Sequence, residues 1–181
     1  MKKLLIYLLL SLLSVQLLKA QDTDYSEISL QSNLRFSAVD STVVNIEDFN
    51  SRITVLYFWT SWNGESRKQL QYISSLSRKM VFRPVTFVAV SLDVNRDVWL
   101  SYVNRLGSGT IVQLYAGNDK EIRKQFNILS VPSIAILNKN SYMVPEGDSY
   151  DISNKLEETL VRLLENKAGT SPLSDSVDIM D

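Results

Sequence analysis

A long apolar run in the middle of the chain places the strongest limit on the fold. Residues 53–59 read Ile-Thr-Val-Leu-Tyr-Phe-Trp, which is typical of a strand buried on both faces of a sheet. Apolar residues then recur at three- to four-residue spacing, which predicts an amphipathic helix whose inward positions are Leu70, Ile73, Leu76 and Met80. A second buried strand is expected over 85–92, so this segment predicts a βαβ unit with a right-handed crossover.

The remaining sequence predicts shorter elements that extend this unit. Strands are expected at 34–39, 43–46, 111–115, 134–137 and 142–144, with a helical turn at 47–51, helices at 95–106 and 120–126, and a hairpin turn at 138–140. In the helix at 95–106, the residues expected to face inward are Val98, Trp99, Tyr102 and Leu106. Asp151 is expected to cap a last helix, whose inward stripe would be Ile152, Leu156, Leu160 and Leu163 or Leu164. This order predicts an α/β fold with a mixed central sheet and helices on both faces.

The first twenty residues have the features of a secretory signal peptide. Lys2 and Lys3 precede an apolar stretch that is short for a membrane span, and Ala20 offers a small residue at the cleavage point. We therefore expect 1–20 to be a signal peptide, 21–33 a polar lead-in segment, 34–166 the folded domain and 167–181 a disordered tail. An uncleaved N-terminal anchor is the alternative interpretation. The first interpretation predicts an exported protein, periplasmic or secreted, with no membrane contact after cleavage.

Charge and composition exclude several kinds of function. Removal of 1–20 would take three lysines from 19 basic residues and none of the 20 acidic ones, leaving a net charge of about −4 and no basic block. Nucleic acid is therefore not an expected partner. The chain contains no Cys and no His, so it forms no disulfide, carries no lipidated cysteine and lacks the commonest metal ligand and catalytic base. The acidic residues Asp93, Asp97, Asp119 and Asp148 are scattered, so neither a metal site nor a cofactor is predicted.

Three segments carry a resemblance to a known family. The chain reads Trp62-Asn63-Gly64-Glu65-Ser66 directly after the first buried strand, Phe126-Asn-Ile-Leu-Ser-Val-Pro132 further on, and Val90-Ser-Leu-Asp93 followed by Trp99. In this order they resemble thioredoxin-like thiol-disulfide oxidoreductases, in particular the exported branch close to peroxiredoxins. The resemblance covers roughly residues 34–166 and implies a three-layer thioredoxin-like fold with a cis peptide bond at Val131–Pro132.

The resemblance also identifies two cysteine positions of the family motif at which this chain has other residues. The family's motif has two cysteines, and their positions are occupied here by Asn63 and Ser66, while Glu65 stands at the position of the motif's proline. The family's chemistry needs a thiolate at a helix N-terminus and a second thiol to resolve the mixed disulfide. We therefore expect no thiol-disulfide exchange by this chain, and no catalytic residue. Asn63 is instead expected to cap the helix, with Glu65 in the first turn next to the positive end of the helix dipole.

A serine hydrolase built on Ser66 is not expected, because the chain offers no histidine as a base. By resemblance, the first hypothesis is a binding or scaffold module for a protein or extended peptide of the envelope, in a groove lined by Trp62, Asn63, Gly64, Glu65, Val131 and Pro132. The alternatives are a non-catalytic or cysteine-borrowing member of an envelope redox system, and a structural secreted domain without a ligand groove. Trp59 is expected in the core, whereas Trp62, at the strand end, is a candidate for partner contact.

Overall fold

The computed structural model describes residues 25–28, 34–49, 51–107, 109–138, 141–145 and 149–165. The strands are β1 (Tyr25–Ile28), β2 (Arg35–Ala38), β3 (Val43–Asn45), β4 (Ile53–Trp59), β5 (Val85–Ser91), β6 (Val112–Tyr115), β7 (Ser133–Asn138) and β8 (Ser141–Pro145). The helices are the 3-10 turn η2 (Ile46–Asp48), α2 (Gly64–Lys79), α3 (Arg96–Leu106), α4 (Lys120–Gln125) and α5 (Ser149–Glu165). The expected signal peptide at 1–20 and tail at 167–181 lie outside the described residues, and β1 falls within the expected lead-in segment at 21–33.

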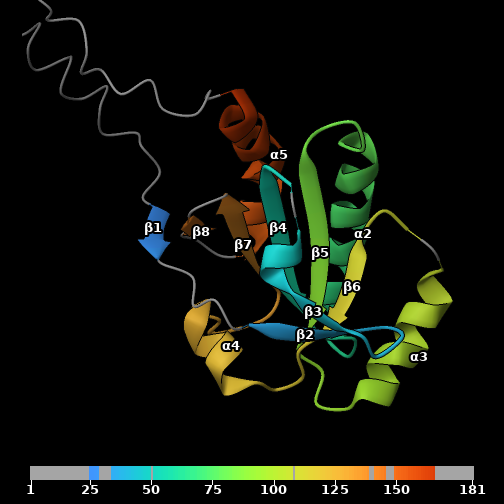
Figure 1. Ribbon diagram of the computed structural model, residues 1–181. Helices are drawn as coiled ribbons and strands as arrows, with labels where there is room; N and C mark the ends of the chain where they lie inside the picture. The colour runs from blue at the N-terminus through green and yellow to red at the C-terminus, as the bar shows by residue number, and fades with distance from the viewer. Residues whose placement is uncertain are drawn as a thin grey trace, which may run out of the picture.

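All eight strands form one sheet in the order β1-β8-β7-β4-β5-β6-β2-β3 (Figure 1). The central strands β4, β5 and β6 are parallel, and the pairs on either side of them are antiparallel. The sheet is therefore mixed, and the predicted βαβ unit is formed by β4, α2 and β5. The outer pair β1–β8 is antiparallel, with Tyr25 opposite Pro145.

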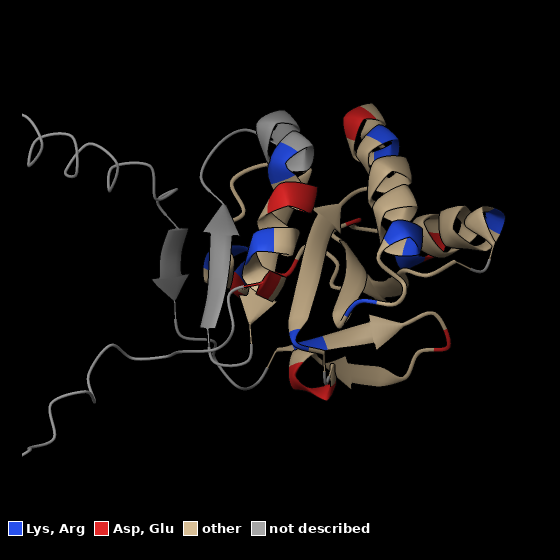
Figure 2. Cartoon of the chain, turned by 90° about the horizontal axis from the view of Figure 1, so that it is seen from above, with Lys and Arg blue, Asp and Glu red and all other residues tan. Residues whose placement is uncertain are grey.

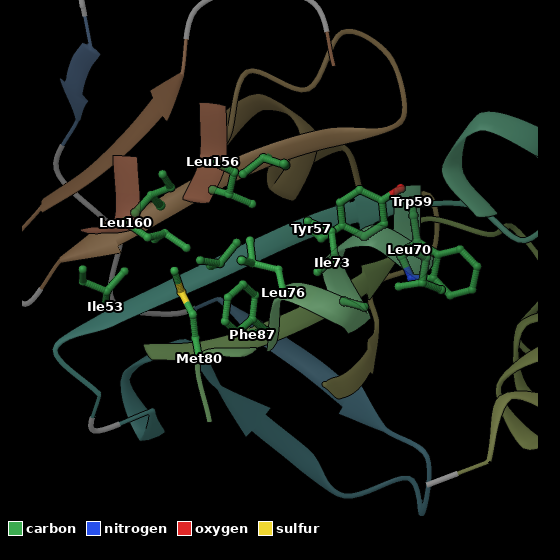
Figure 3. Close-up of a cluster of buried hydrophobic side chains, with 14 of the residues drawn as sticks. Ile53, Tyr57, Trp59, Leu70, Ile73, Leu76, Met80, Phe87, Leu156 and Leu160 are labelled. Carbon is green, nitrogen blue, oxygen red and sulfur yellow. The ribbon is translucent and has the colours of Figure 1, made fainter. Parts of the chain in front are cut away.

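Strand β4 is buried along its whole length, because both faces of the sheet are covered. On one face, alternate residues from Ile53 to Trp59 pack against the inward residues of α2, α3 and α5, as Figure 3 shows for much of this cluster. On the other face, Leu56 and Phe58 pack against α4, and the Phe58 and Phe126 ring centroids are 5.0 Å apart. Helices on both faces of a mixed sheet confirm the predicted three-layer fold.

The starts of three helices follow from their capping residues. The side chains of Asn63, Asn95 and Asp119 each accept hydrogen bonds from backbone N–H groups in the first turn of α2, α3 and α4. These bonds satisfy donors that have no partner inside the helix. The cap that we predicted for Asn63 is thus confirmed, with Asn63 Oδ1 2.8 Å from the Ser66 nitrogen.

Two predictions about helices are wrong. In α3, Trp99 is buried and Tyr102 half-buried as expected, but Val98 and Leu106 are exposed, and Val103 takes the inward position instead. Helix α3 packs on the sheet mainly at β6, so its buried stripe is narrower than the full apolar pattern. The last helix begins at Ser149, so Asp151 lies inside α5 and cannot be its cap. Its inward stripe consists of Leu156, Leu160 and Leu164, while the side chain of Ile152 lies outside the described set.

The described surface carries charges of both signs. Acidic and basic residues alternate along α5, and basic residues occupy both ends of α2 (Figure 2). Lys79 of α2 forms an ion pair with Glu157 of α5, which joins the two helices on the same face of the sheet. Within the described residues, no helix is both long enough and apolar enough to cross a membrane.

Candidate functional site

The turn between β4 and α2 is fixed by a buried carboxylate. Asp93 follows β5 and is only 2% exposed. Its two oxygens each lie 3.0 Å from the Ser61 nitrogen, and they also accept bonds from the Ser61 hydroxyl at 3.0 Å and the Ser91 hydroxyl at 2.8 Å. Charge-assisted bonds of this kind are stronger than neutral ones. They tie the C-terminal ends of β4 and β5 together and so set where the next residue, Trp62, leaves the sheet.

Asn63 is bonded to two different parts of the fold. Its side-chain oxygen caps α2, and its side-chain nitrogen donates to the carbonyl oxygen of Val131 at 3.4 Å. Val131 is half-buried and precedes buried Pro132, and the peptide bond between them is cis. A single amide thus joins the helix start to the 131–132 segment. The structure brings the predicted residues Asn63 and Val131 into direct contact.

Ser66 lies in the first turn of α2 and is fully buried. Its backbone carbonyl accepts a hydrogen bond of 2.7 Å from the Tyr57 hydroxyl, but its own side-chain oxygen has no hydrogen-bond partner among the described residues. Burial raises the pKa of Tyr57 far above its ordinary value, against the opposing effect of the bond to Ser66. Tyr57 therefore stays protonated and serves as a donor, while the Ser66 hydroxyl has neither a base nor access to solvent.

Trp62 presents a large apolar side chain to solvent, with 68% of its surface exposed, whereas Trp59 is fully buried. Two other exposed apolar residues lie on the loops bonded to this turn. Val94 follows Asp93 and is 80% exposed, and Leu129 lies two residues before Val131 and is 88% exposed. We call the surface formed by Trp62, Val94, Leu129 and Val131 the turn surface. Their loops are joined to one turn by the bonds of Asp93 to Ser61 and of Asn63 to Val131, and exposed apolar residues that form a patch mark interaction sites more often than scattered single ones do.

The other predicted groove residues lie at the start of α2. Gly64 and Glu65 are exposed, and the Glu65 carboxylate accepts a bond of 3.2 Å from the Gln69 amide. Arg67 donates to the Ser61 carbonyl at 2.9 Å and so supports the turn from the helix side. Trp62, Gly64 and Glu65 contribute no hydrogen bond to the 131–132 segment within the described part of the chain, so Asn63 alone makes that connection.

At the positions of the family's two cysteines, the structure has an amide that caps α2 and a buried hydroxyl. No cluster of acidic side chains that could hold a metal ion occurs in the described residues. Sequence reasoning grouped Asp93 with scattered acids and did not identify its role, because its partners Ser61 and Ser91 belong to two different strand ends. A signal was present in the polar Ser91 and Asp93 that interrupt the end of an apolar run.

Comparisons with known proteins bear on the family and the fold. A family model described as thioredoxin-like matches residues 50–143. The thiol-disulfide oxidoreductase ResA of Bacillus thuringiensis subsp. konkukian is 21% identical over 131 residues, which span 72% of this chain and 75% of that protein.

Solved structures show the same fold at low sequence identity. The thioredoxin domain of a thiol-disulfide oxidoreductase from Bacteroides vulgatus aligns with a TM-score of 0.59 at 17% identity, covering 74% of this chain and 99% of that one. The dsbF protein of MTB aligns with a TM-score of 0.59 at 18% identity, covering 73% and 96%. Their names describe redox proteins, whereas the chain described here contains no cysteine.

Proposed function

The chain belongs to the thioredoxin-like family, and from that premise we propose that it is a redox-inactive member that binds a protein or an extended peptide at the turn surface. The observation that carries the proposal is the 68% exposure of Trp62 at the end of a fully buried strand. A large aromatic side chain in such a place exposes much apolar surface to water, and binding of a partner would bury that surface. Aromatic anchors dominate the affinity of many interfaces.

The lack of redox activity rests on the two positions at the start of α2. An amide stands at 63 and a hydroxyl at 66, and neither forms a disulfide. Both residues have local roles, since Asn63 caps the helix and the Ser66 carbonyl accepts the bond from Tyr57. The site therefore keeps an ordered helix start without the thiolate chemistry.

The backbone next to Pro132 supports recognition of an extended chain. A carbonyl oxygen has two lone pairs, and the bond from Asn63 to the Val131 carbonyl is long at 3.4 Å. Val131 can therefore accept a hydrogen bond from a peptide that lies alongside it, as in strand addition. The apolar side chains of Trp62, Val94 and Leu129 would then contact the side chains of that peptide.

We place this function outside the cytoplasm, on the strength of the basic and apolar residues at 1–20. Cell fractionation of the natural host tests this part of the proposal. Recovery of the protein with an intact N-terminus in the cytoplasm would contradict it.

The binding proposal is tested with peptides selected for affinity to the purified protein from a random 12-residue library. Trp62→Ala is expected to weaken the selected peptides roughly 30-fold or more, the range of a binding hot spot. Phe82→Ala is the matched control, because Phe82 is an aromatic residue with 98% exposure that follows the opposite end of α2. If no peptide is selected, or if the two variants lose affinity equally, the proposal is wrong.

The alternative of a member that borrows cysteines from a partner makes a different prediction. It requires thiol-disulfide exchange in the presence of a dithiol protein and none without it. An insulin-reduction assay of the protein with and without added reduced thioredoxin separates the two, because a redox-inactive binder adds nothing to the rate in either case.

A further inference from the structure

A second candidate site lies away from the turn surface, between α2, α3 and the start of β6. The structure has a cavity of about 320 Å³ there, whose lining includes Arg67, Leu70, Arg78, Tyr102, Ile111 and Gln113. This is at the lower end of the size range of small-molecule pockets, roughly 300 to 1,000 Å³. Gln71, Ser75, Arg78 and Leu106 are exposed, so the cavity is open to solvent on that side.

The charge of the cavity is positive. Two guanidinium groups line it, from Arg67 and Arg78, and no Asp or Glu is among the lining residues. Arg67 donates to a backbone carbonyl, and Arg78 donates to the Ser74 and Ser75 hydroxyls at 2.8 and 3.1 Å. Neither arginine is paired with a carboxylate in the described part of the chain. Their charge is therefore available to a bound anion, and the Ser74 hydroxyl stands next to Arg78 as a further donor, whereas the Ser75 hydroxyl donates to the Gln71 carbonyl.

The inner part of the cavity is apolar and well supported. Leu70 is buried and Ile111 half-buried, and both line the cavity from the core side. The Tyr102 ring packs against Trp59 in a tilted arrangement, with the ring centroids 5.4 Å apart, and the Arg105 guanidinium lies 5.7 Å from the Tyr102 ring centroid. A flat apolar group placed here would contact a fixed aromatic ring rather than a mobile one.

Gln113 adds a polar group to the same cavity. Its side-chain oxygen is buried and has no hydrogen-bond partner among the described residues. Buried acceptors without a partner cost stability, so an occupant whose donor reached this oxygen would be favoured. Among the described residues, the lining thus combines two arginines that have no carboxylate partner, an apolar inner surface and one acceptor without a hydrogen bond.

From this arrangement we propose that the cavity binds a small organic anion that has an aromatic or otherwise flat apolar body. The acidic group would lie near Arg78, and the apolar body would lie against Tyr102, Leu70 and Ile111. This proposal is independent of peptide binding at the turn surface. A carboxylate with an indole ring has the required anion, apolar body and N–H donor.

The test is an NMR titration of the ¹⁵N-labelled protein with indole-3-acetate, with indole-3-acetamide and with acetate. The amide keeps the apolar body without the charge, and acetate keeps the charge without the apolar body. We expect indole-3-acetate to shift the amide signals of Ser74, Tyr102 and Gln113 and to bind at least roughly tenfold more tightly than either control. The proposal is overturned if these signals do not move or if a control compound binds equally well.

Variants test the assignment to this cavity. Arg78→Gln removes an exposed cation and should weaken indole-3-acetate roughly tenfold or more. Gln113→Glu places a negative charge in the cavity with little change of shape. This charge repels the carboxylate of the ligand and should abolish the preference for indole-3-acetate over indole-3-acetamide. Lys68→Gln is the matched control, since Lys68 is an exposed cation of α2 outside the lining and its loss changes the net charge equally. Equal losses in the Arg78 and Lys68 variants would show a nonspecific charge effect and overturn the proposal.

Discussion

Replacement of Asp93 tests whether a buried carboxylate holds the turn that begins the candidate site. In Asp93→Ala, three donors lose their acceptor: the Ser61 backbone N–H and the hydroxyls of Ser61 and Ser91. The hydroxyls can rotate to other acceptors, but the buried backbone N–H has no such freedom, and leaving it unpaired costs about 1–3 kcal/mol. Each lost bond to a charged acceptor contributes about 1.5–3 kcal/mol, and relief of the desolvation of the carboxylate offsets part of the total.

We therefore expect Asp93→Ala to lower the free energy of unfolding by about 3–4 kcal/mol, a large part of the 5–15 kcal/mol typical of a domain. Asp93→Asn should cost only about 1 kcal/mol, because its carbonyl oxygen can still accept both bonds from Ser61 and its amide can donate to Ser91. Urea unfolding measures both differences as shifts of the midpoint at constant slope.

The control for these two variants is Asp97→Ala, which removes an exposed carboxylate from the first turn of α3. Its loss affects only the helix dipole and should cost at most about 0.5 kcal/mol. If Asp93→Ala lies within 1 kcal/mol of the unaltered protein, or if the Asn and Ala variants at 93 are equally unstable, the role assigned to this carboxylate is wrong.

Further predictions concern the start of α2. Asn63→Ala should lower the free energy of unfolding by about 1–2 kcal/mol in urea. Asn63→Ser also loses the bond to the Val131 carbonyl but keeps a capping oxygen, so it should be about 0.5–1 kcal/mol more stable than Asn63→Ala; equal losses would refute the capping role. Ser66→Ala should be neutral or stabilising by up to about 1 kcal/mol in the same assay, since it removes a buried hydroxyl without a partner, and a clear loss would mean that the hydroxyl is bonded. Joint Asn63→Cys and Ser66→Cys replacement should give a protein that forms a disulfide and reduces insulin with dithiothreitol above the background rate, while either single variant should not, because the helix N-terminus favours a thiolate but exchange needs both thiols. Burial raises the pKa of Tyr57 on folding, so the unfolded chain loses this proton first as pH rises above about 10, and stability at alkaline pH should fall more steeply in the unaltered protein than in Tyr57→Phe.

The central βαβ unit and the helix start could be predicted because their signals are local. The apolar run over 53–59, the three- to four-residue spacing in α2 and the amide at 63 each act on neighbouring residues, and each is found as expected. The inward face of α3 was predicted less well. Val98 and Leu106 fit the helical period, but the width of a buried stripe depends on how much of the sheet lies beneath the helix, and the sequence of the helix does not contain that information.

The features that define the candidate site were the hardest to predict, because they join residues that are distant along the chain. Asn63 reaches Val131, and Asp93 reaches Ser61, through contacts that exist only once the strands have been placed in order. The cavity beside Tyr102 likewise needs α2, α3 and β6 in position. Residue type showed that each of these groups could form bonds, but only the fold determined the partners.

The strand order also bears on the sequence of events during folding. Strands β4 and β5 are neighbours in the sheet and are connected along the chain by the single helix α2. In contrast, β2 pairs with β6, and β1 pairs with β8 (Figure 1). In the β1–β8 pair, Tyr25 lies opposite Pro145. During synthesis from the N-terminus, the first strands of the sheet are made long before the strands that receive them. Long-range pairing of this kind slows folding and prolongs the time for which strand edges are open to wrong partners. The β4-α2-β5 unit can therefore assemble early around its own core, whereas both margins of the sheet close only when the C-terminal half has arrived.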